Sequence, residues 1–327
     1  MTVGIFICLN GIQVLGFNMQ FGMAGILNFA FIVLVAVGAY ATAIASVSPA
    51  PNDGFTYYIG GFGWQFPWNV LFGVGCTLVF ALILGGLALR RLRHDYLALT
   101  LVALGQGLQI LVLDDPRLFN GNDGILNVPA PWADLSLVDF QFAFLAMSFV
   151  LLVVVYLIMA RVTASPWGRA LKAIREDEEA AASLGRSVWG RKLVAFLIGA
   201  GAAGLSGSLL AIYVGGWNAG AWATGENLIL LAAVIVGGRG RHLGALVGTI
   251  LLFGGIVEGT RFLPAVPGQM ELIPSLRGIA IGLLVLGFLW WRPEGILSER
   301  KERFSPERDD QGNALRGSEP SRTGASS

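Results

Sequence analysis

SPWGRALKAIREDEEAAASLGRSVWGRK, residues 165–192, is the longest polar interruption in an otherwise apolar sequence. Ser165 suits the N-cap of a helix, and Pro166 suits its first position, where no backbone donor is needed. Gly185 offers a C-terminal stop. Apolar residues recur between them at helical spacing, which predicts one short amphipathic helix with a narrow apolar stripe: Ala170, Ile174, Ala181, Leu184 and Val188.

The other face of this predicted helix is charged. Arg169, Lys172 and Arg175 are followed by the acidic run 176–179. A charged run of this kind is most simply a solvated helical loop. The helix is too short to span a bilayer, however, so its apolar stripe needs something outside the membrane to bury against. A groove on a partner protein is one such place.

The composition of the chain indicates a membrane protein. Of its 327 residues, 55% are hydrophobic and only 13% are charged, whereas a soluble domain carries about 25% charged residues. Repeated apolar runs predict an all-α polytopic membrane protein with roughly 8–9 transmembrane or partial helices. The expected segments are 3–17, 26–46, 68–89, 96–113, 140–160, 193–214, 226–237, 243–257 and 276–291.

Two of these segments look irregular. The run 3–17 is short for a full span and leads into 16–25, which is rich in glycine and amide side chains and has no charge. Such backbone is tolerated at membrane depth only where protein or a wet cavity covers it. Gly105-Gln106-Gly107 interrupts the run 96–113, which is therefore predicted to be broken or to line a cavity.

Basic residues set the expected orientation. If the loop at 90–93 is cytoplasmic, so are 161–192, 239–241 and everything from 292 onward, and the acidic loop 114–139 faces outward. Of 22 basic residues, only Arg117, Arg261 and Arg277 then lie on or beside the outer side, as the positive-inside rule requires. We therefore expect a multi-pass protein of a bacterial-type plasma (inner) membrane with a cytoplasmic C-terminus. Residues 1–297 would form the membrane domain, and the polar tail 298–327 would be disordered.

No enzyme signature is present. The sequence has no His-Glu-x-x-His, no Gly-x-Ser-x-Gly, no metal-spaced Cys/His cluster and no Gly-x-x-x-x-Gly-Lys-Ser/Thr loop for ATP. We predict no catalytic residue, no bound metal, no cofactor held by this chain and no nucleic-acid partner, so any use of ATP requires a separate ATPase subunit. His94 and His242 adjoin basic residues and are interpreted as snorkelling side chains at the membrane interface.

Polar residues inside the spans are candidates for a substrate pathway, because such groups face the protein interior or a wet cavity. They are Asn18, Gln20, Asn28, Gln106, Gln109 and Asn227. Hydrogen bonding to neighbouring helices is the equally good alternative. Small residues that repeat on the segment 193–214 predict close helix packing: Ala200, Gly204, Gly207 and Ser208.

Several motifs resemble one family. Glu179-Ala180-Ala181, followed by Gly185, is similar to the EAA loop of ABC importer membrane subunits, although the Ile-x-Leu-Pro ending of that loop is absent. The longer string GRALKAIREDEEAAASLG resembles the permeases for branched-chain amino acids, the LivM type in particular. The resemblance extends over about 16–295, because two further strings are similar to the same family: GFNMQFGMAGILNFAF near the start and ENLILLAAVIVGGRGRHLGALVGTILL at 226–252.

The resemblance implies a permease subunit of an ATP-driven ABC importer that moves branched-chain or similar small amino acids. Such a subunit works in the lipid membrane with a second, LivH-like permease subunit, two ABC ATPase subunits and an extracytoplasmic solute-binding protein. It also implies a cytoplasmic helix that couples to an ATPase through Gly168, Arg169, Ile174, Arg175, Glu176, Asp177, Glu179, Ala180, Ala181 and Gly185. A self-sufficient channel or secondary transporter, or an ABC permease for urea, short amides or sugars, is the alternative.

Overall fold

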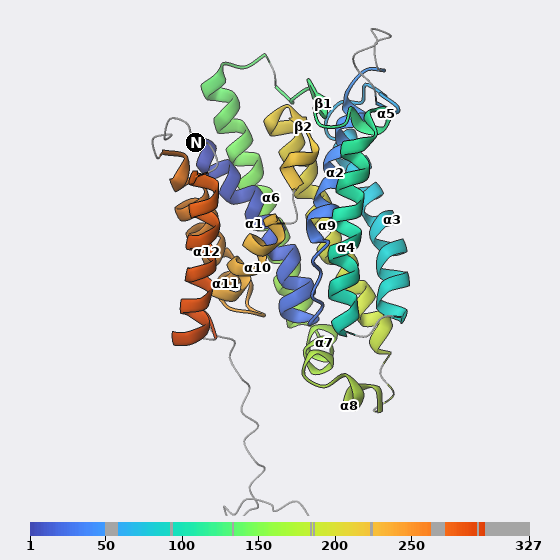
Figure 1. The fold of residues 1–327 in the computed structure, drawn as a ribbon, viewed down its shortest axis with the longest axis vertical. Helices are drawn as coiled ribbons and strands as arrows, with labels where there is room; N and C mark the ends of the chain where they lie inside the picture. The colour runs from blue at the N-terminus through green and yellow to red at the C-terminus, as the bar shows by residue number, and fades with distance from the viewer. Residues whose placement is uncertain are drawn as a thin grey trace, which may run out of the picture.

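The computed structural model describes residues 1–49, 58–91, 94–132, 134–183, 185, 187–222, 225–262, 272–292 and 294–297. Long helices run side by side along one axis of the molecule (Figure 1). Five of the described helices are long and apolar enough to cross a membrane. These are α1 with its extension η1 (Thr2–Asn18 and Met19–Met23), α3 (Trp68–Arg91), α4 (His94–Asp114), α6 (Leu137–Ala164) and α9 (Val188–Val214). The predicted all-α polytopic membrane fold is confirmed.

Shorter apolar helices complete the membrane part: α2 (Phe31–Ser46), α10 (Gly225–Gly237), α11 (His242–Thr249) with its π-helical extension η3 (Ile250–Val257), and α12 (Leu272–Trp291). The remaining elements are α5 (Pro116–Phe119), α7 (Pro166–Glu176), α8 (Glu178–Ser183), η2 (Ala219–Trp222) and η4 (Gly259–Phe262). Strands β1 (Ile125–Leu126) and β2 (Gly216–Trp217) pair antiparallel, with Ile125 opposite Trp217. The predicted tail 298–327 lies outside the described residues.

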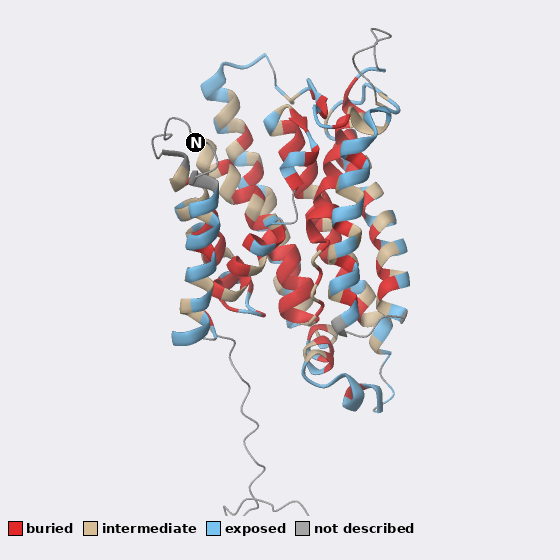
Figure 2. Ribbon diagram, in the orientation of Figure 1, coloured by how far each residue is buried: buried red, intermediate tan, exposed pale blue. Residues whose placement is uncertain are grey.

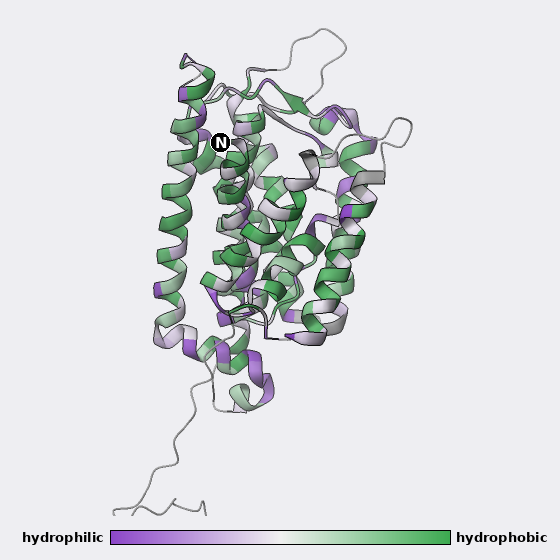
Figure 3. Ribbon diagram, turned by 90° about the vertical axis from the view of Figure 1, so that its left-hand side faces the viewer, coloured by the Kyte–Doolittle hydropathy of each residue, from purple (hydrophilic) through white to green (hydrophobic). Residues whose placement is uncertain are grey.

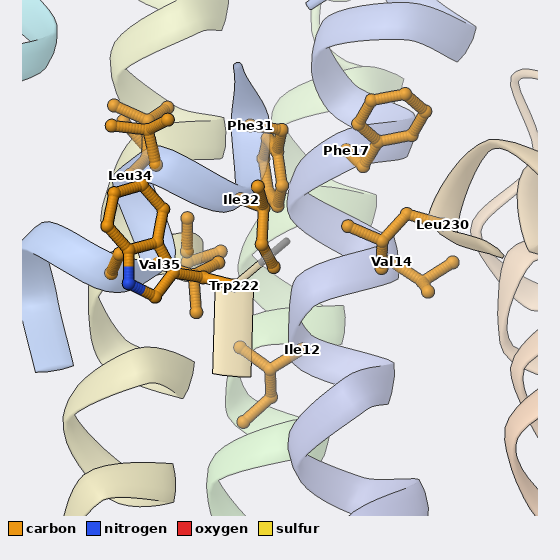
Figure 4. Close-up of a cluster of buried hydrophobic side chains, with 14 of the residues drawn as sticks. Ile12, Val14, Phe17, Phe31, Ile32, Leu34, Val35, Trp222 and Leu230 are labelled. Atoms are coloured by element: carbon orange, nitrogen blue, oxygen red, sulfur yellow. The ribbon is translucent and has the colours of Figure 1, made fainter. Parts of the chain in front are cut away.

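The buried core lies around α1, α2 and α9, and the helices that surround it expose their outer faces (Figure 2). Phe17 of α1, Phe31 and Ile32 of α2 and Leu230 of α10 converge in it (Figure 4). The exposed faces of the long helices are apolar, and polar residues gather at α7 and α8 beyond one end of them (Figure 3). A helix bundle with an apolar outer surface fits a hydrocarbon environment.

The first helix is longer than its apolar run. The sequence predicted a short span ending near Phe17 and irregular backbone from Gly16, but the helix continues as the π-helix η1 to Met23. The break comes later, at 24–30, and α2 begins at Phe31 instead of about Ile26. The prediction was wrong because glycine and amide side chains only weaken a helix, and here neighbouring helices bury the whole of η1.

Of the two alternatives predicted for Gly105-Gln106-Gly107, the broken helix is wrong. Helix α4 runs unbroken from His94 to Asp114. An added Cβ would meet nothing closer than 3.5 Å at Gly105 and nothing within 4 Å at Gly107. Two glycines therefore cost this helix some stability without breaking it.

Candidate functional site

The polar stretch that begins at Ser165 folds into two helices instead of the predicted one. Ser165 caps α7, as expected, by accepting a hydrogen bond from the Gly168 N–H at 3.3 Å. Asp177 then ends α7 with extended backbone (φ −149°, ψ 105°) and accepts a hydrogen bond from the Ala180 N–H at 2.9 Å. Asp177 is thus the N-cap of α8. The hydrogen bond of this cap is favoured over a single helix that would continue through Asp177.

The apolar stripe of the helix pair packs on the chain itself. Ala170, Leu171, Ile174 and Ala181 are all buried, and α7 contacts α6, α9 and η1. A Cβ on Gly168 would collide with the backbone of Thr163, so α7 sits tightly against the end of α6. Ala170, Ile174 and Ala181 therefore do not need a partner's groove. Val188 belongs to α9 instead of the stripe, and Leu184 lies outside the described residues.

Charged and small residues form the outward face of the pair. Of the predicted coupling residues, Gly168, Ile174 and Ala181 are buried and Arg175 is part-buried, whereas the others are exposed: Arg169, Glu176, Asp177, Glu179, Ala180 and Gly185. The exposed set lies beyond one end of the membrane helices (Figure 1). We call it the α7–α8 face. It is the surface of this stretch that another protein can reach.

Arg175 connects α7 to the break in the first membrane segment. Its guanidinium donates a hydrogen bond to the Gly22 carbonyl oxygen at the end of η1, where helix carbonyls lack intrahelical partners and a positive charge is favourable. Lys192 of α9 pairs with Glu178 of α8. Arg175, Glu178 and Lys192 border a cavity of about 210 Å³ that Ala24 and Gly25 also line. The helix pair is therefore tied to η1 and to α9 by charged side chains.

Three of the six predicted pathway residues, Gln20, Asn28 and Asn227, meet around the break at 24–30, and Asn18 lies by the turn between α10 and α11. Asn28 donates to the Gln20 amide oxygen at 2.8 Å, and Gln20 donates to the Phe196 carbonyl of α9 at 2.8 Å. Asn227 accepts from the Ile32 N–H at 3.0 Å and donates to the Phe29 carbonyl. Asn18 accepts from the Gly240 N–H at 3.1 Å. Asn227, and Asn28 through a hydrogen bond from the Ala30 N–H, satisfy backbone groups of the broken segment, as irregular backbone inside a membrane requires.

The other two predicted pathway residues lie elsewhere, on α4. Gln106 is exposed, and Gln109 donates a hydrogen bond to the Ala219 carbonyl of η2 at 2.9 Å. Neither belongs to the amide group around the break. Spacing along one apolar run could not reveal this, because it does not say which face of α4 meets the core.

The snorkelling interpretation of His242 is wrong. Its side chain is only 7% exposed, and its Nδ1 lies 3.3 Å from the Asn18 amide nitrogen. The Tyr156 ring lies edge-on to it, with ring centroids 6.5 Å apart. Neighbouring Arg239 and Arg241 are the exposed members of this turn. The side chain of His94 lies outside the described residues.

The predicted small residues of α9 lie at its contacts with α2 and α3. All four are buried. A Cβ on Gly204 would stand 2.6 Å from the Thr77 hydroxyl of α3, and one on Gly207 would collide with the Val35 carbonyl of α2. Ser208 accepts from the Thr42 hydroxyl at 2.7 Å. Close packing here lies within the subunit.

A second cavity, of about 550 Å³, lies at the β1–β2 end of the molecule between α1, α10, η3 and α12. We call it the α1–α10 cavity. Its polar lining is Asn10, Gln13, Asn218, Glu226, Glu258 and Arg277. No local sequence pattern indicates this cavity, because it brings together positions more than 200 residues apart.

Comparisons with known proteins give one consistent family. The high-affinity branched-chain amino acid transport system permease protein LivM of Escherichia coli (strain K12) is 30% identical over 308 residues, which cover 86% of this chain and 66% of that protein. LivM of Salmonella typhimurium gives the same figures. A probable branched-chain amino acid transport permease protein LivM of Methanocaldococcus jannaschii is 24% identical, covering 88% of this chain and 89% of that protein.

The chain thus spans just under two thirds of the length of the two enterobacterial relatives. No solved structure matches it. The family model for the branched-chain amino acid transport system / permease component matches residues 3–289, nearly the whole membrane part. On that match, this chain belongs to the family of permease components of branched-chain amino acid transport systems.

Proposed function

We propose that this chain is a membrane-spanning permease subunit of an ATP-driven ABC importer for branched-chain or similar small amino acids. A second permease subunit, two ABC ATPases and an extracytoplasmic solute-binding protein would complete the importer. Family membership supports the transport role, and the names of the relatives support the substrate class. The assembly sits in the inner membrane with the α7–α8 face and the C-terminus in the cytoplasm.

The single observation that carries the ATP-driven mechanism is the attachment of the α7–α8 face to the membrane helices. An ATPase seated on exposed Glu179 and Ala180 pushes on a helix pair whose apolar side is fixed to its own subunit. Arg175 passes that displacement to η1, and Lys192 passes it to α9. Coupling of this kind needs a contiguous set of packed elements, which these contacts provide.

Purification with partner subunits tests the proposal. The chain, expressed with its candidate ATPases and companion permease, is expected to elute as one complex with ATPase in fixed proportion to the permease. Transport by the chain alone, with no ATPase bound, would favour a self-sufficient carrier and refute the importer.

Cysteine labelling tests the orientation. In a Cys8→Ala/Cys76→Ala background, which removes both native thiols, a cysteine at exposed Asn122 should react with an impermeant thiol reagent added outside intact cells. A cysteine at exposed Ser183 should react only after the membrane is opened. The reverse labelling pattern would put the α7–α8 face on the wrong side for an ATPase.

A further inference from the structure

The α1–α10 cavity presents an unpaired amide. Phe6, Asn10 and Gln13 of α1 are spaced to share one helix face, and all three line the cavity. Asn10 donates back to the Phe6 carbonyl at 2.9 Å. Gln13 is only 3% exposed and has no hydrogen-bond partner among the described residues. Its amide atoms are not among the enclosed polar atoms that lack a partner, so the amide is open to the cavity and can hydrogen-bond a group placed there.

Charges of both signs line the same cavity. Glu226 lies in the first turn of α10, Glu258 follows η3 and is 4% exposed, and Arg277 lies on α12. Arg277 attracts Glu226 electrostatically, yet no direct ion pair joins these two described side chains. Ionisable groups inside a membrane protein are expensive and usually serve its function. Here a carboxylate and a guanidinium are held near one another without neutralising each other by contact.

Apart from Asn218, the rest of the cavity wall is apolar or glycine. Its side chains come from α2, α9, α10 and η3: Ile32, Leu210, Val214, Leu230, Phe253 and Val257. Two of them, Ile32 and Leu230, lie at the inner core (Figure 4). The volume of about 550 Å³ is ample for one small molecule. A lining that combines charges of both signs and amides with apolar side chains matches a molecule with both characters.

We propose that the α1–α10 cavity binds the zwitterionic head of an α-amino acid that has an apolar side chain. Glu226 accepts hydrogen bonds from the ammonium group, Arg277 donates to the carboxylate, and the Gln13 amide orients the head. This inference rests on the proposed function and adds the residues that recognise the substrate. Urea and sugars carry no charge to pair with Glu226 or Arg277 and would leave both of them unmatched.

The competing explanation is structural. Glu226 and Arg277 also flank the contact between α10 and α12, so their mutual attraction could serve only to hold these two helices together. The two roles differ in what a charge swap does. Glu226→Arg/Arg277→Glu keeps the attraction between the helices, but it reverses the positions at which the ammonium and carboxylate groups would bind.

The experiment measures ATP-driven uptake of L-leucine by vesicles that hold the complete complex, with one fixed solute-binding protein. Glu226→Gln and Arg277→Gln are expected to lower uptake at least about tenfold, with unchanged assembly and ATPase co-purification. The charge-swapped protein should remain as impaired as the single variants. Arg292→Gln, an exposed position at the end of α12, is the matched control and should transport normally.

Each outcome decides a separate point. Wild-type uptake by both single variants, or recovery of uptake in the charge-swapped protein, would overturn the binding site while leaving the importer intact. Absence of ATP-driven L-leucine uptake in the wild type would instead refute the proposed function. If the charge variants do not assemble, Gln13→Leu decides, because it removes only the amide: reduced uptake supports the site, and wild-type uptake refutes it.

Discussion

Ala180→Trp is expected to abolish ATP-driven uptake while the subunit still inserts into the membrane. Ala180 is exposed on α8, beside exposed Glu179, so an indole there prevents an ATPase from seating closely without disturbing the fold. Glu179→Lys reverses a charge at the same contact. Loss of a central contact costs about 3 kcal/mol, which lowers docking affinity roughly 100-fold. The measurements are ATPase co-purification and uptake by inverted and right-side-out vesicles.

The control variants keep the interpretation specific. Asp134→Lys makes the same kind of charge reversal in the exposed loop before α6 and should leave uptake unchanged. A bulky residue at Gly185 is a poor probe, because Gly185 has φ +74° and any large side chain strains its backbone. Gly185→Asn tolerates that conformation and should transport. Normal uptake by both Ala180→Trp and Glu179→Lys would show that the α7–α8 face does not meet an ATPase.

Gly207→Ala is expected to unfold the subunit or to disrupt the packing of its core. The added methyl group would collide with the Val35 carbonyl of α2, and a backbone carbonyl cannot move without shifting its helix. Overpacking of this kind costs ~3 kcal/mol or more. Gly204→Leu acts in the same way against Thr77 of α3. The measurement is the thermal stability of the purified subunit in detergent, together with the yield of monodisperse protein.

Gly201 provides the matched control on the same helix. A Cβ there approaches only the Leu78 side chain, at 3.7 Å. Gly201→Ala is therefore expected to stabilise α9 by about 0.5–1 kcal/mol, the usual difference in helix propensity. Equal stability of the Gly201→Ala and Gly207→Ala proteins would show that α9 does not pack on α2 as described.

The sequence alone was sufficient for the class of fold and for most spans, because apolar length and charge distribution reflect the membrane directly. It failed where two local preferences compete. Asp177 suits a helix interior poorly and an N-cap well, so the choice between one helix and two depended on the hydrogen bond to Ala180. The extension of α1 through Met23 depended on burial by other helices, which apolar spacing does not encode.

The candidate site was predictable only in part for the same reason. Motif resemblance pointed to Glu179 and Ala180, which are exposed as a docking face requires. It could not indicate that Ile174 is buried against its own subunit. The link from Arg175 to Gly22, and the cavity that Gln13 and Glu226 both line, involve residues that are far apart in the chain. Such contacts follow from the tertiary packing and leave no local pattern in the sequence.

The most direct test of the importer is uptake of L-leucine by vesicles containing the purified complex. Wild-type uptake is predicted to require three things together: the solute-binding protein on the outer side, the two ATPases, and ATP on the side of the α7–α8 face. A non-hydrolysable ATP analogue should not sustain it. Full uptake without ATP, driven by an ion gradient or by the leucine gradient alone, would contradict the assignment of this chain to an ATP-driven importer.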